Sequence, residues 1–512
     1  MIKNSTEKKI KDQEKLSMIG GGTNKISIQH QKGKLTARER LDILLDHGSF
    51  IEIDKLVEQK TRNSHITKKS VPGDGVITGY GTINGRTVFV YSQDFTVIGG
   101  SLGEMHSQKI NKIQDLALRS RQPIIGLNDS GGARIQEGIN SLKGYGEIFQ
   151  RNVNASGIIP QITLVMGPCA GGAAYSPALT DFIFMVKGTS YMYLTGPDVV
   201  KAATYETVTH EDLGGSEVHC KKSGICDLLF DNDIDCLNAT REFLDYLPSS
   251  NVATMPVHKT NDSVNRIDTN LDGLISSNES KPYDIKKIIL TIVDEENFVE
   301  LKESFACNIV IGFARFAGKT VGIVANQPME MAGCLDINAS TKAARFVRFC
   351  DAFSIPILSL VDVPGFLPGT DQEYKGIIKH GAKLLFAFAE ATVPKITIII
   401  RKAYGGAYVV MGSKHIGNDI NLSWYNTKIS VMNAETASTI IHKNHILSTQ
   451  AQQEFHHMYE KKISSPLTAA SMGYLDEIIQ PSTTRLKVCR YLDLLQYKKI
   501  DKLWKKHDNL PL

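Results

Sequence analysis

The sequence lacks a strong excess of charge of either sign. Its 58 lysines and arginines nearly balance 54 aspartates and glutamates, which leaves a net charge of +4 over 512 residues. So small an excess does not indicate a nucleic-acid-binding or membrane-surface protein, and we expect no nucleic acid and no membrane as partners. With 42% hydrophobic and 22% charged residues, the chain has the composition of a globular protein.

Long hydrophobic runs are also missing. Apolar stretches such as residues 396–400 are far too short to span a membrane. Residues 1–17 are rich in Lys but also carry Glu and Asp. They have neither the apolar core of a signal peptide nor the Arg-rich, acid-poor composition of a transit peptide. We therefore expect a cytoplasmic protein.

Cysteine is present, but not in a pattern typical of disulfides or metal sites. None of the eight cysteines forms a Cys-x-x-Cys pair, and the nearest two, Cys220 and Cys226, are six positions apart. This spacing favours buried, reduced thiols. We expect no metal site.

The chain does contain an internal repeat. The stretch PQITLVMGPCAGGA at residues 160–173 returns as PKITIIIRKAYGGA at residues 394–407. An offset of 233 residues aligns earlier positions in the same order: 79–90 with 312–323, Lys109 with Lys342, and Asp129 with Asp362. One inserted residue then gives the offset of 234 at Gly-Gly-Ala. Because the order is kept over more than ninety residues, we infer two homologous halves of one fold.

Each half is predicted to alternate strands and helices. The apolar runs PIIGL, QITLVM, PILSLVD and KITIII are typical of strands buried on both faces. Apolar residues recur every three to four positions in residues 103–120 and 338–353, which predicts amphipathic helices. Further helices are expected at residues 35–46 and from Arg485, with a polar linker at residues 249–284. The alternation predicts a layered α/β architecture.

Two short motifs resemble active-site loops but lack the required context. GGSLG at residues 99–103 fits a nucleophile elbow, yet the preceding strand ends too early, so we expect a structural turn before a helix. FAGKT at residues 316–320 resembles the end of a phosphate-binding loop, but Phe313 stands where that loop needs glycine. We expect a β-hairpin turn there.

The stretch DSGGARIQEG at residues 129–138 allows two interpretations. It follows a buried strand and places Arg134 close to two glycines. It is either a strand-end loop with a structural arginine or a loop that faces a ligand at the carboxyl end of a strand. We take Arg134 as a candidate substrate-binding residue.

The two Gly-Gly-Ala turns indicate sites for negatively charged oxygen. Each follows a buried strand and is predicted to begin a helix at Ala173 or Ala407. The first N–H groups of a helix have no partner within it, and the helix dipole adds partial positive charge. Two such turns suggest two reactants that each develop an oxyanion. Because no acid–base pair or triad is evident beside them, one reactant must supply its own base.

The chain resembles a known family through several long motifs spread over nearly its whole length. They include GKLTARERLDILLD, YSQDFTVIGGSLGE, NDSGGARIQEG, GPCAGGAAYSPALTDF, VDVPGFLPGTDQEYKGIIKHGAKLL and RKAYGGAY. They are similar to those of the carboxyltransferase subunits of biotin-dependent acyl-CoA carboxylases. The resemblance implies two tandem homologous crotonase-like (ClpP/crotonase) domains, at residues 5–262 and 267–507.

The resemblance also implies a reaction and its partners. Carbon dioxide would pass from carboxybiotin to the α carbon of propionyl-CoA and give methylmalonyl-CoA. Biotin would be carried by a partner α subunit with biotin carboxylase and biotin carrier domains, which would use ATP. This chain has no Met-Lys-Met attachment site. It would form a homohexameric core within an α6β6 complex.

The matching motifs imply roles for individual residues. Gly171 and Gly172 would hold the thioester enolate. Gly406 and Ala407, with Gly405 beside them, would hold the ureido oxygen of biotin.

Further residues are expected along the substrate. Val409, where many propionyl-preferring members carry a carboxylate, would line the acyl pocket. Gly312 and Gly333 are expected at the substrate, and CoA is expected to cross residues 298–329.

Two departures from the family pattern concern the biotin side. Asn433 and Thr436 stand where the family usually has glycines, and Asn433 aligns with Gly196 in the repeat. If glycine served a positive φ, Asn would be the least unfavourable replacement. We expect these changes to weaken the biotin site.

Three alternatives remain open at this point. The first is an acetyl-CoA-directed or decarboxylating member of the same family, favoured by Val409. The second is a crotonase-type hydratase or hydrolase that uses Glu104 or Asp129 as acid or base. The third is a non-catalytic assembly subunit whose biotin site has decayed.

Overall fold

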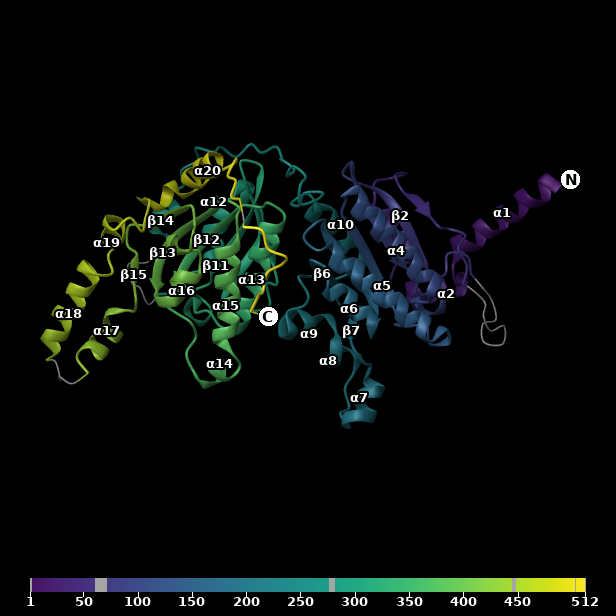
Figure 1. Cartoon of the computed structure of the whole chain (residues 1–512), viewed down its shortest axis with the longest axis horizontal. Helices are drawn as coiled ribbons and strands as arrows, with labels where there is room; N and C mark the ends of the chain where they lie inside the picture. The colour runs from purple at the N-terminus through teal and green to yellow at the C-terminus, as the bar shows by residue number, and fades with distance from the viewer. Residues whose placement is uncertain (1, 60–70, 276–280, 444–447, 502, 512) are drawn as a thin grey trace. The chain divides into compact units, whose positions relative to one another are not determined.

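The chain folds into two compact units, Met1–Thr254 and Met255–Leu512 (Figure 1). The computed structural model describes residues 2–59, 71–275, 281–443, 448–501 and 503–511. Residues 276–280 of the predicted linker lie outside the described residues. The predicted domain limits, 5–262 and 267–507, stay a prediction.

The first unit is built on a sheet of eight strands. The order is β1-β2-β3-β4-β5-β6-β8, and β7 pairs with β5. The strands are β1 (Ile51–Ile53), β2 (Val76–Ile83), β3 (Arg86–Gln93), β4 (Ile124–Ser130), β5 (Gln161–Ala170), β6 (Phe182–Val186), β7 (Tyr191–Tyr193) and β8 (Leu228–Phe230). The β1–β2 and β2–β3 pairs are antiparallel, and all pairs from β3 onward are parallel.

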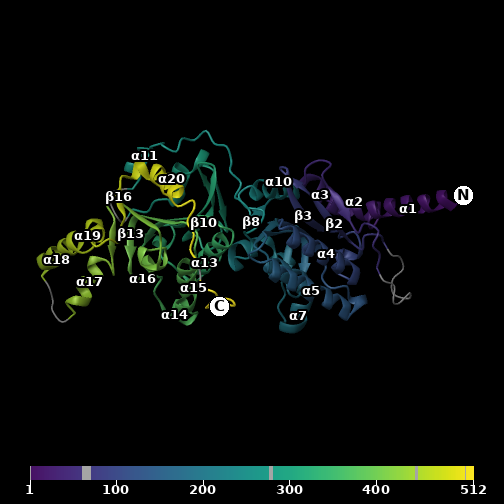
Figure 2. The same ribbon diagram turned by 45° about the horizontal axis from the view of Figure 1, so that its top comes forward.

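Helices cover both faces of this sheet. They are α1 (Ile2–Ile19), α2 (Thr23–Gln31), α3 (Ala37–Leu44), α4 (Glu104–Ser120), α5 (Ile139–Ala155), α6 (Gly172–Ala178), α7 (Pro197–Thr204), α8 (His210–Gly214), α9 (Ser216–Val218) and α10 (Asp233–Leu244). Helices α4 and α5 pack together, and α4 contacts β2 and β3 (Figure 2). Helix α3 also contacts these strands and packs against α10, which lies on β6 and β8.

The second unit repeats this design. Its sheet has the order β16-β14-β13-β12-β11-β10-β9, and β15 pairs with β13. The strands are β9 (Phe298–Leu301), β10 (Ile309–Phe316), β11 (Lys319–Asn326), β12 (Ile357–Val363), β13 (Lys395–Tyr404), β14 (Ile420–Trp424), β15 (Lys428–Ser430) and β16 (Glu477–Ile479). The two sheets have the same strand order, which confirms the α/β fold with two similar halves.

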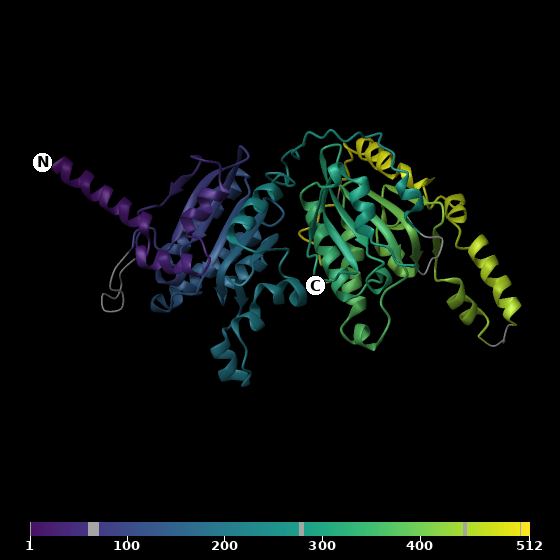
Figure 3. The ribbon, with the colours of Figure 1, turned by 180° about the vertical axis from the view of Figure 1, so that it is seen from behind.

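The helices of the second unit follow the same plan. They are α11 (Asn270–Leu274), α12 (Ile285–Ile292), α13 (Ile337–Ala352), α14 (Thr370–Tyr374), α15 (Ile377–Glu390), α16 (Gly405–Val410), α17 (Ala434–Ile441), α18 (Thr449–Lys462), α19 (Pro466–Ser471) and α20 (Thr484–Leu494). Helices α13 and α15 pack together. The yellow C-terminal helix α20 packs on the same core cluster as α12 (Figure 3).

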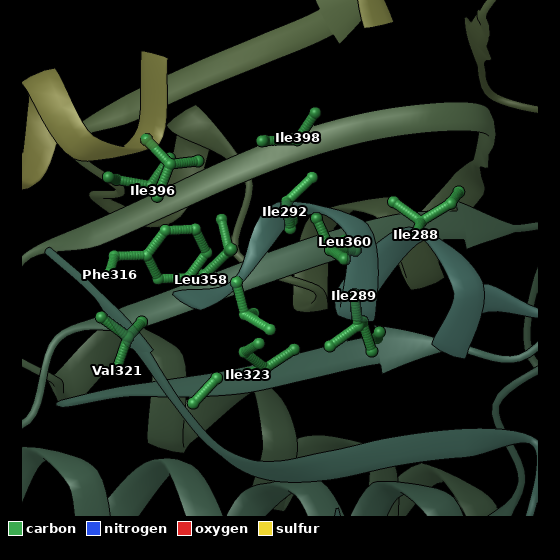
Figure 4. Close-up of a cluster of buried hydrophobic side chains, with 14 of the residues drawn as sticks. Ile288, Ile289, Ile292, Phe316, Val321, Ile323, Leu358, Leu360, Ile396 and Ile398 are labelled. Carbon is green, nitrogen blue, oxygen red and sulfur yellow. The ribbon is translucent and has the colours of Figure 1, made fainter. Parts of the chain in front are cut away.

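The core of the second unit follows from strand alternation. Leu358 and Leu360 of β12 lie on one face of the sheet and meet Ile288 and Ile292 of α12 (Figure 4). All four are buried, with at most 2% of their surface exposed. Each such side chain contributes roughly 1.5–3 kcal/mol when it leaves water. The apolar runs of the sequence thus become strands with helices on both sides.

Several sequence predictions are confirmed at this level. The helices expected at 103–120, 338–353 and 35–46 are α4, α13 and α3, and the tail from Arg485 forms most of α20. The GGSLG stretch is a turn before α4. FAGKT is the hairpin between β10 and β11, which are paired from Phe316 and Lys319 onward. The two N-terminal helices, α1 and α2, were not predicted.

A buried lysine fixes the same loop in each unit. In the second unit, Lys342 Nζ donates to the carbonyl groups of Lys302, Phe305, Ala306 and Ile309 at 2.7–3.3 Å. Its repeat partner Lys109 donates to the carbonyl groups of Gly73 and Val76 at 2.9 and 2.5 Å. Both lysines are 3% exposed or less. The repeated lysines therefore satisfy backbone acceptors that would otherwise be buried without donors.

We expect Lys342→Met to destabilise the second unit by about 1–3 kcal/mol, because the carbonyl oxygens lose their donor. Urea unfolding followed by tryptophan fluorescence measures this loss. Buried Trp424 and exposed Trp504, the two tryptophans of the chain, both belong to the second unit. The control is Lys379→Met, which removes an exposed lysine of α15. Equal urea midpoints for the two variants would contradict the role of Lys342.

Candidate functional site: two glycine turns at the carboxyl ends of central strands

The Gly-Gly turns lie where the sequence predicts them. Strand β5 ends at Ala170, and α6 begins at Gly172; strand β13 ends at Tyr404, and α16 begins at Gly405. Gly171 and Gly405 both have φ of 60°, a conformation that strongly favours glycine. The strand–turn–helix geometry is confirmed, with each helix starting slightly before the predicted alanine.

The N–H groups of the first turn differ in availability. The N–H of Gly171 donates to the carbonyl oxygen of Tyr193 at 3.0 Å, which ties the turn to β7. Because this N–H is already bonded, Gly171 has no N–H to offer a ligand in this structure, in contrast to the role expected for it. The next two residues, Gly172 and Ala173, are the first of α6, and N–H groups at these positions have no acceptor within the helix. They are the repeat partners of Gly406 and Ala407.

The two turns also differ in the space beside the second glycine. A Cβ on Gly172 would lie 2.8 Å from ring carbons of Tyr145 on α5. A Cβ on Gly406 would meet nothing closer than a ring carbon of Phe366 at 4.0 Å. Gly406 is exposed and Gly172 half-buried. The sequence pattern did not reveal Tyr145 or Phe366, because neither belongs to a glycine motif.

A buried carboxylate supports the strand next to each turn. Asp129 Oδ2 is 2.6 Å from Lys34 Nζ and 3.0 Å from Arg40 Nη1. Asp129 and Arg40 are fully buried, and Lys34 is 5% exposed. Burial lowers the pKa of Lys34, while the charge of Asp129 opposes this shift. Asp129 is fully buried and paired with two cations, so it supports the end of the strand and has no surface to present to a substrate.

The second unit satisfies its carboxylate differently. Asp362 Oδ2 accepts from Arg401 Nε at 2.9 Å and from the Tyr283 hydroxyl at 2.8 Å. Burial raises the pKa of Asp362, and the Arg401 guanidinium opposes this shift. In both units the strand register shifts around the aspartate, between Asn128 and Ser130 and between Val361 and Val363. Such a bulge re-aims a side chain.

Arg134 is a structural residue. Its guanidinium donates to Asp74 Oδ1 and Glu137 Oε1 at 2.8 Å and to the carbonyl oxygen of Ser101 at 3.0 Å. It is 1% exposed. Its donors are used inside the unit, and the substrate contact expected for Arg134 stays a prediction. It holds the loop after β4 against the start of α4.

Gly312 and Gly333 lie where backbone segments pack closely. A Cβ on Gly312 would lie 2.2 Å from the carbonyl oxygen of Val299 on the neighbouring strand β9. Gly333 has φ of 78°, and its Cβ would lie 2.6 Å from the carbonyl oxygen of Asp362. Both glycines are buried. They allow close approach of backbone segments, and the substrate role expected for them stays a prediction.

The departures at Asn433 and Thr436 have a local explanation. Asn433 and its partner Gly196 are N-caps with φ of −68° and −72°, so no positive φ is required at this position. The side chain of Asn433 accepts from the N–H of Thr436 at 2.8 Å. An Asn N-cap stabilises a helix by about 1 kcal/mol relative to alanine. The explanation through positive φ is wrong, and the expected weakening of the biotin site stays a prediction.

The other sequence expectations stand as follows. Val409 is half-buried on α16, and its role in the acyl pocket stays a prediction. The cysteines are free, but Cys307 is exposed and Cys334 half-buried, so not all are buried. Within the described ranges, no cluster of three or more His, Cys, Asp or Glu side chains could hold a metal ion. None of the helices described is both long and apolar enough to cross a membrane.

Comparisons with known proteins agree on one family. The carboxyl transferase domain model matches residues 28–510. The propionyl-CoA carboxylase β chain of Cereibacter sphaeroides is 56% identical over 497 residues, 97% of this chain and 98% of that relative. The methylmalonyl-CoA decarboxylase subunit α of Veillonella parvula is 51% identical over 501 residues, 98% of each chain.

A solved structure is similar over the whole chain. It is transcarboxylase 12S, described as a hexamer assembly with methylmalonyl-coenzyme A and methylmalonic acid bound. It superposes with a TM-score of 0.97 at 45% identity and covers 99% of both chains.

The unequal space at the two turns predicts unequal stability changes. We expect Gly172→Ala to lower the free energy of unfolding by about 1–3 kcal/mol, because the new methyl group overlaps the Tyr145 ring. Gly406→Ala should change it by no more than about 0.5 kcal/mol. Urea unfolding followed by far-UV circular dichroism compares them. In a Tyr145→Ala background the loss at Gly172 should shrink; an unchanged loss would argue against the overlap.

Proposed function

Because the chain belongs to the carboxyl transferase family, we propose that it is the carboxyltransferase subunit of a biotin-dependent acyl-CoA carboxylase, a propionyl-CoA carboxylase β chain. It transfers carbon dioxide from carboxybiotin to the α carbon of propionyl-CoA and gives methylmalonyl-CoA. The observation that carries this proposal is the pair of matched Gly-Gly turns, each at the end of a central strand. The 56% identity to the Cereibacter relative over nearly the whole chain supports it.

The first turn holds the thioester oxygen of the acyl-CoA. The family resemblance assigns Gly171 and Gly172, but the Gly171 N–H is bonded to Tyr193. We therefore place the oxygen at the N–H groups of Gly172 and Ala173. These donors and the positive end of α6 stabilise the negative charge that develops on the oxygen when the α proton leaves. Tyr145 lies against Gly172 and limits the space on one side.

The second turn holds the ureido oxygen of biotin. Gly406 and Ala407 supply the N–H groups, and Gly405 supplies the turn that aims them. A planar ureido group fits the exposed backbone at Gly406, because outside the adjoining residues of its own helix only the Phe366 ring edge comes within 4.0 Å of its Cβ position. When bound, carboxybiotin supplies both the carbon dioxide and a nitrogen that accepts the α proton.

The partners follow from the family. Biotin is carried on an α subunit that contains the biotin carboxylase and biotin carrier domains and uses ATP. The chain forms a homohexameric core of an α6β6 complex, as the hexamer described for the similar transcarboxylase 12S supports. A cytoplasmic location stays a prediction.

A second candidate is a decarboxylating member of the same family. The 51% identity to the methylmalonyl-CoA decarboxylase subunit α of Veillonella parvula favours it. The same two oxyanion sites serve both directions, because the enolate is common to carboxylation and decarboxylation.

The first test mixes the chain with its biotinylated partner, ATP and labelled bicarbonate. We expect label on propionyl-CoA at about 10–200 times the kcat/KM for acetyl-CoA, because one methylene in an apolar pocket contributes about 1–3 kcal/mol. Preference for acetyl-CoA would indicate the acetyl-CoA-directed alternative that Val409 favours. An assembled complex that fixes no label on either acyl-CoA would contradict the proposed carboxylase function.

A side chain at Gly406 should abolish carboxylation without unfolding the unit. Gly406 is exposed and does not have a positive φ, so Gly406→Leu is tolerated by the fold but covers the N–H groups. We expect turnover to fall by a factor on the order of 10²–10³. The matched control is Gly273→Leu on α11, an exposed glycine with nothing within 4 Å of its Cβ position. Near-normal turnover of Gly406→Leu would remove Gly406 from the site.

A further inference from the structure

The first glycine turn is tied to the short strand β7. This strand pairs in parallel with the end of β5, and Tyr193 lies opposite Ala170. The carbonyl oxygen of Tyr193 then accepts from the N–H of Gly171 at 3.0 Å. Gly171 is the residue of the turn with φ of 60°. The position of β7 therefore fixes the direction of the N–H groups that follow, at Gly172 and Ala173.

The segment that carries α8 and α9 lies on the other edge of β7. Gly215, between these two helices, forms an antiparallel bridge with Tyr191. A Cβ on Gly214 would lie 2.1 Å from the carbonyl oxygen of Met192, so the end of α8 packs directly on the strand (Figure 1). The strand is therefore enclosed between β5 and this segment, and contacts from the segment determine where it lies.

His219, directly after α9, bonds to the backbone of β7. Its Nε2 lies 2.7 Å from the carbonyl oxygen of Met192, the central residue of the strand. Its Nδ1 lies 2.8 Å from the hydroxyl oxygen of Ser223. Because a carbonyl oxygen can only accept, Nε2 carries the hydrogen and donates. In the neutral ring Nδ1 then accepts from the Ser223 hydroxyl, which fixes the tautomer and the orientation of the ring.

The turn that carries His219 has an unusual backbone. Residues His219–Ser223 form a π-helical turn, and Gly224 ends it with φ of 65°. Turns of this kind are rare and occur frequently at functional sites. The backbone thus departs from a regular helix at the residue that bonds to β7.

The second unit holds the matching strand in another way. Ile429 has the place in β15 that Met192 has in β7, since each is the central residue of a strand paired with the end of a longer neighbour. The N–H of Ile429 donates to the carbonyl oxygen of Ser464 at 2.9 Å. This bond is made by the main chain, whereas His219 uses its side chain. A change at His219 therefore acts on the first turn and leaves the contacts of β15 in place.

We propose that His219 is a positioning residue for the first glycine turn: its Nε2–H group holds β7 through the carbonyl oxygen of Met192, and β7 holds Gly171. The proposal rests on the proposed function, which puts the thioester oxygen at Gly172 and Ala173. An enolate oxygen carries more negative charge than a thioester oxygen, so well-aimed N–H groups stabilise the transition state more than the bound substrate. Loss of the His219 bond therefore lowers kcat rather than raising KM.

The test measures labelled bicarbonate fixed on propionyl-CoA by the assembled complex, with variants at position 219. In His219→Ala we expect kcat to fall about 10–100-fold with an unchanged KM, because a misplacement of about 1 Å in a site costs up to about 10²-fold. His219→Gln, whose amide N–H can reach the same carbonyl oxygen, should restore most of the rate. The control is His47→Ala, which removes an exposed histidine between α3 and β1 and should leave kcat unchanged.

Hydrogen–deuterium exchange of residues 166–178 tests the contact without the reaction. In His219→Ala the N–H groups around Gly171 should lose protection, because β7 opens locally when its carbonyl contact is removed. In His219→Gln and His47→Ala their protection should equal that of the wild type.

The outcomes separate this proposal from the proposed function. A wild-type kcat in His219→Ala, equal rates for His219→Ala and His219→Gln, or a change in KM alone would overturn the role of His219. If His219→Ala does not fold, His219→Asn replaces it, because this side chain is too short to reach Met192; if neither folds, His219 serves the whole unit and the proposal fails. If the wild type fixes no label but the exchange near Gly171 responds to His219→Ala alone, the positioning stands and the carboxylase function fails.

Discussion

A buried carboxylate at the end of a central strand is the constraint on which each unit depends. Asp129 and Asp362 occupy matching bulges, and a lone buried carboxylate would be expelled or protonated without a partner. Removing one partner of such a pair typically costs about 3–5 kcal/mol. In the first unit Lys34 and Arg40 pair with Asp129. In the second unit Arg401 pairs with Asp362, and the Tyr283 hydroxyl donates to it. Each carboxylate lies on the strand paired with the one that leads into a glycine turn, β4 beside β5 and β12 beside β13.

The repeat made most of the fold predictable from the sequence. Buried parallel strands have continuous apolar runs, and helices that cover them have a three-to-four periodicity. Because the chain contains the repeat, each pattern occurs in both halves, and the prediction for one half supports the prediction for the other. The structure of the segments that precede each repeat was harder to predict from the sequence. Helices α1 and α2 are polar, and Lys25 of α2 bonds to Thr96 in the loop after β3, which lies 71 residues further along the chain.

The site was only partly predictable, for a physical reason. Sequence identifies a strand–glycine–helix turn, because glycine at positive φ and an apolar strand are local properties. It does not tell which N–H is already bonded, as the Gly171 bond to Tyr193 shows. Nor does it tell whether an arginine in a glycine-rich loop faces a ligand or three acceptors of its own unit, as Arg134 does. Such distinctions depend on residues brought together by the fold.

The source of the counter-charges has a consequence for how the chain is made. The cationic partners of Asp129 are Lys34 and Arg40, which precede it in the sequence. Arg40 also pairs with Asp233, so the four side chains form one ion-pair network. All of them belong to the first unit. During synthesis, domains generally fold as units from the N-terminus. The first unit can therefore neutralise its buried charge and close its core on the ribosome before the second unit has been translated.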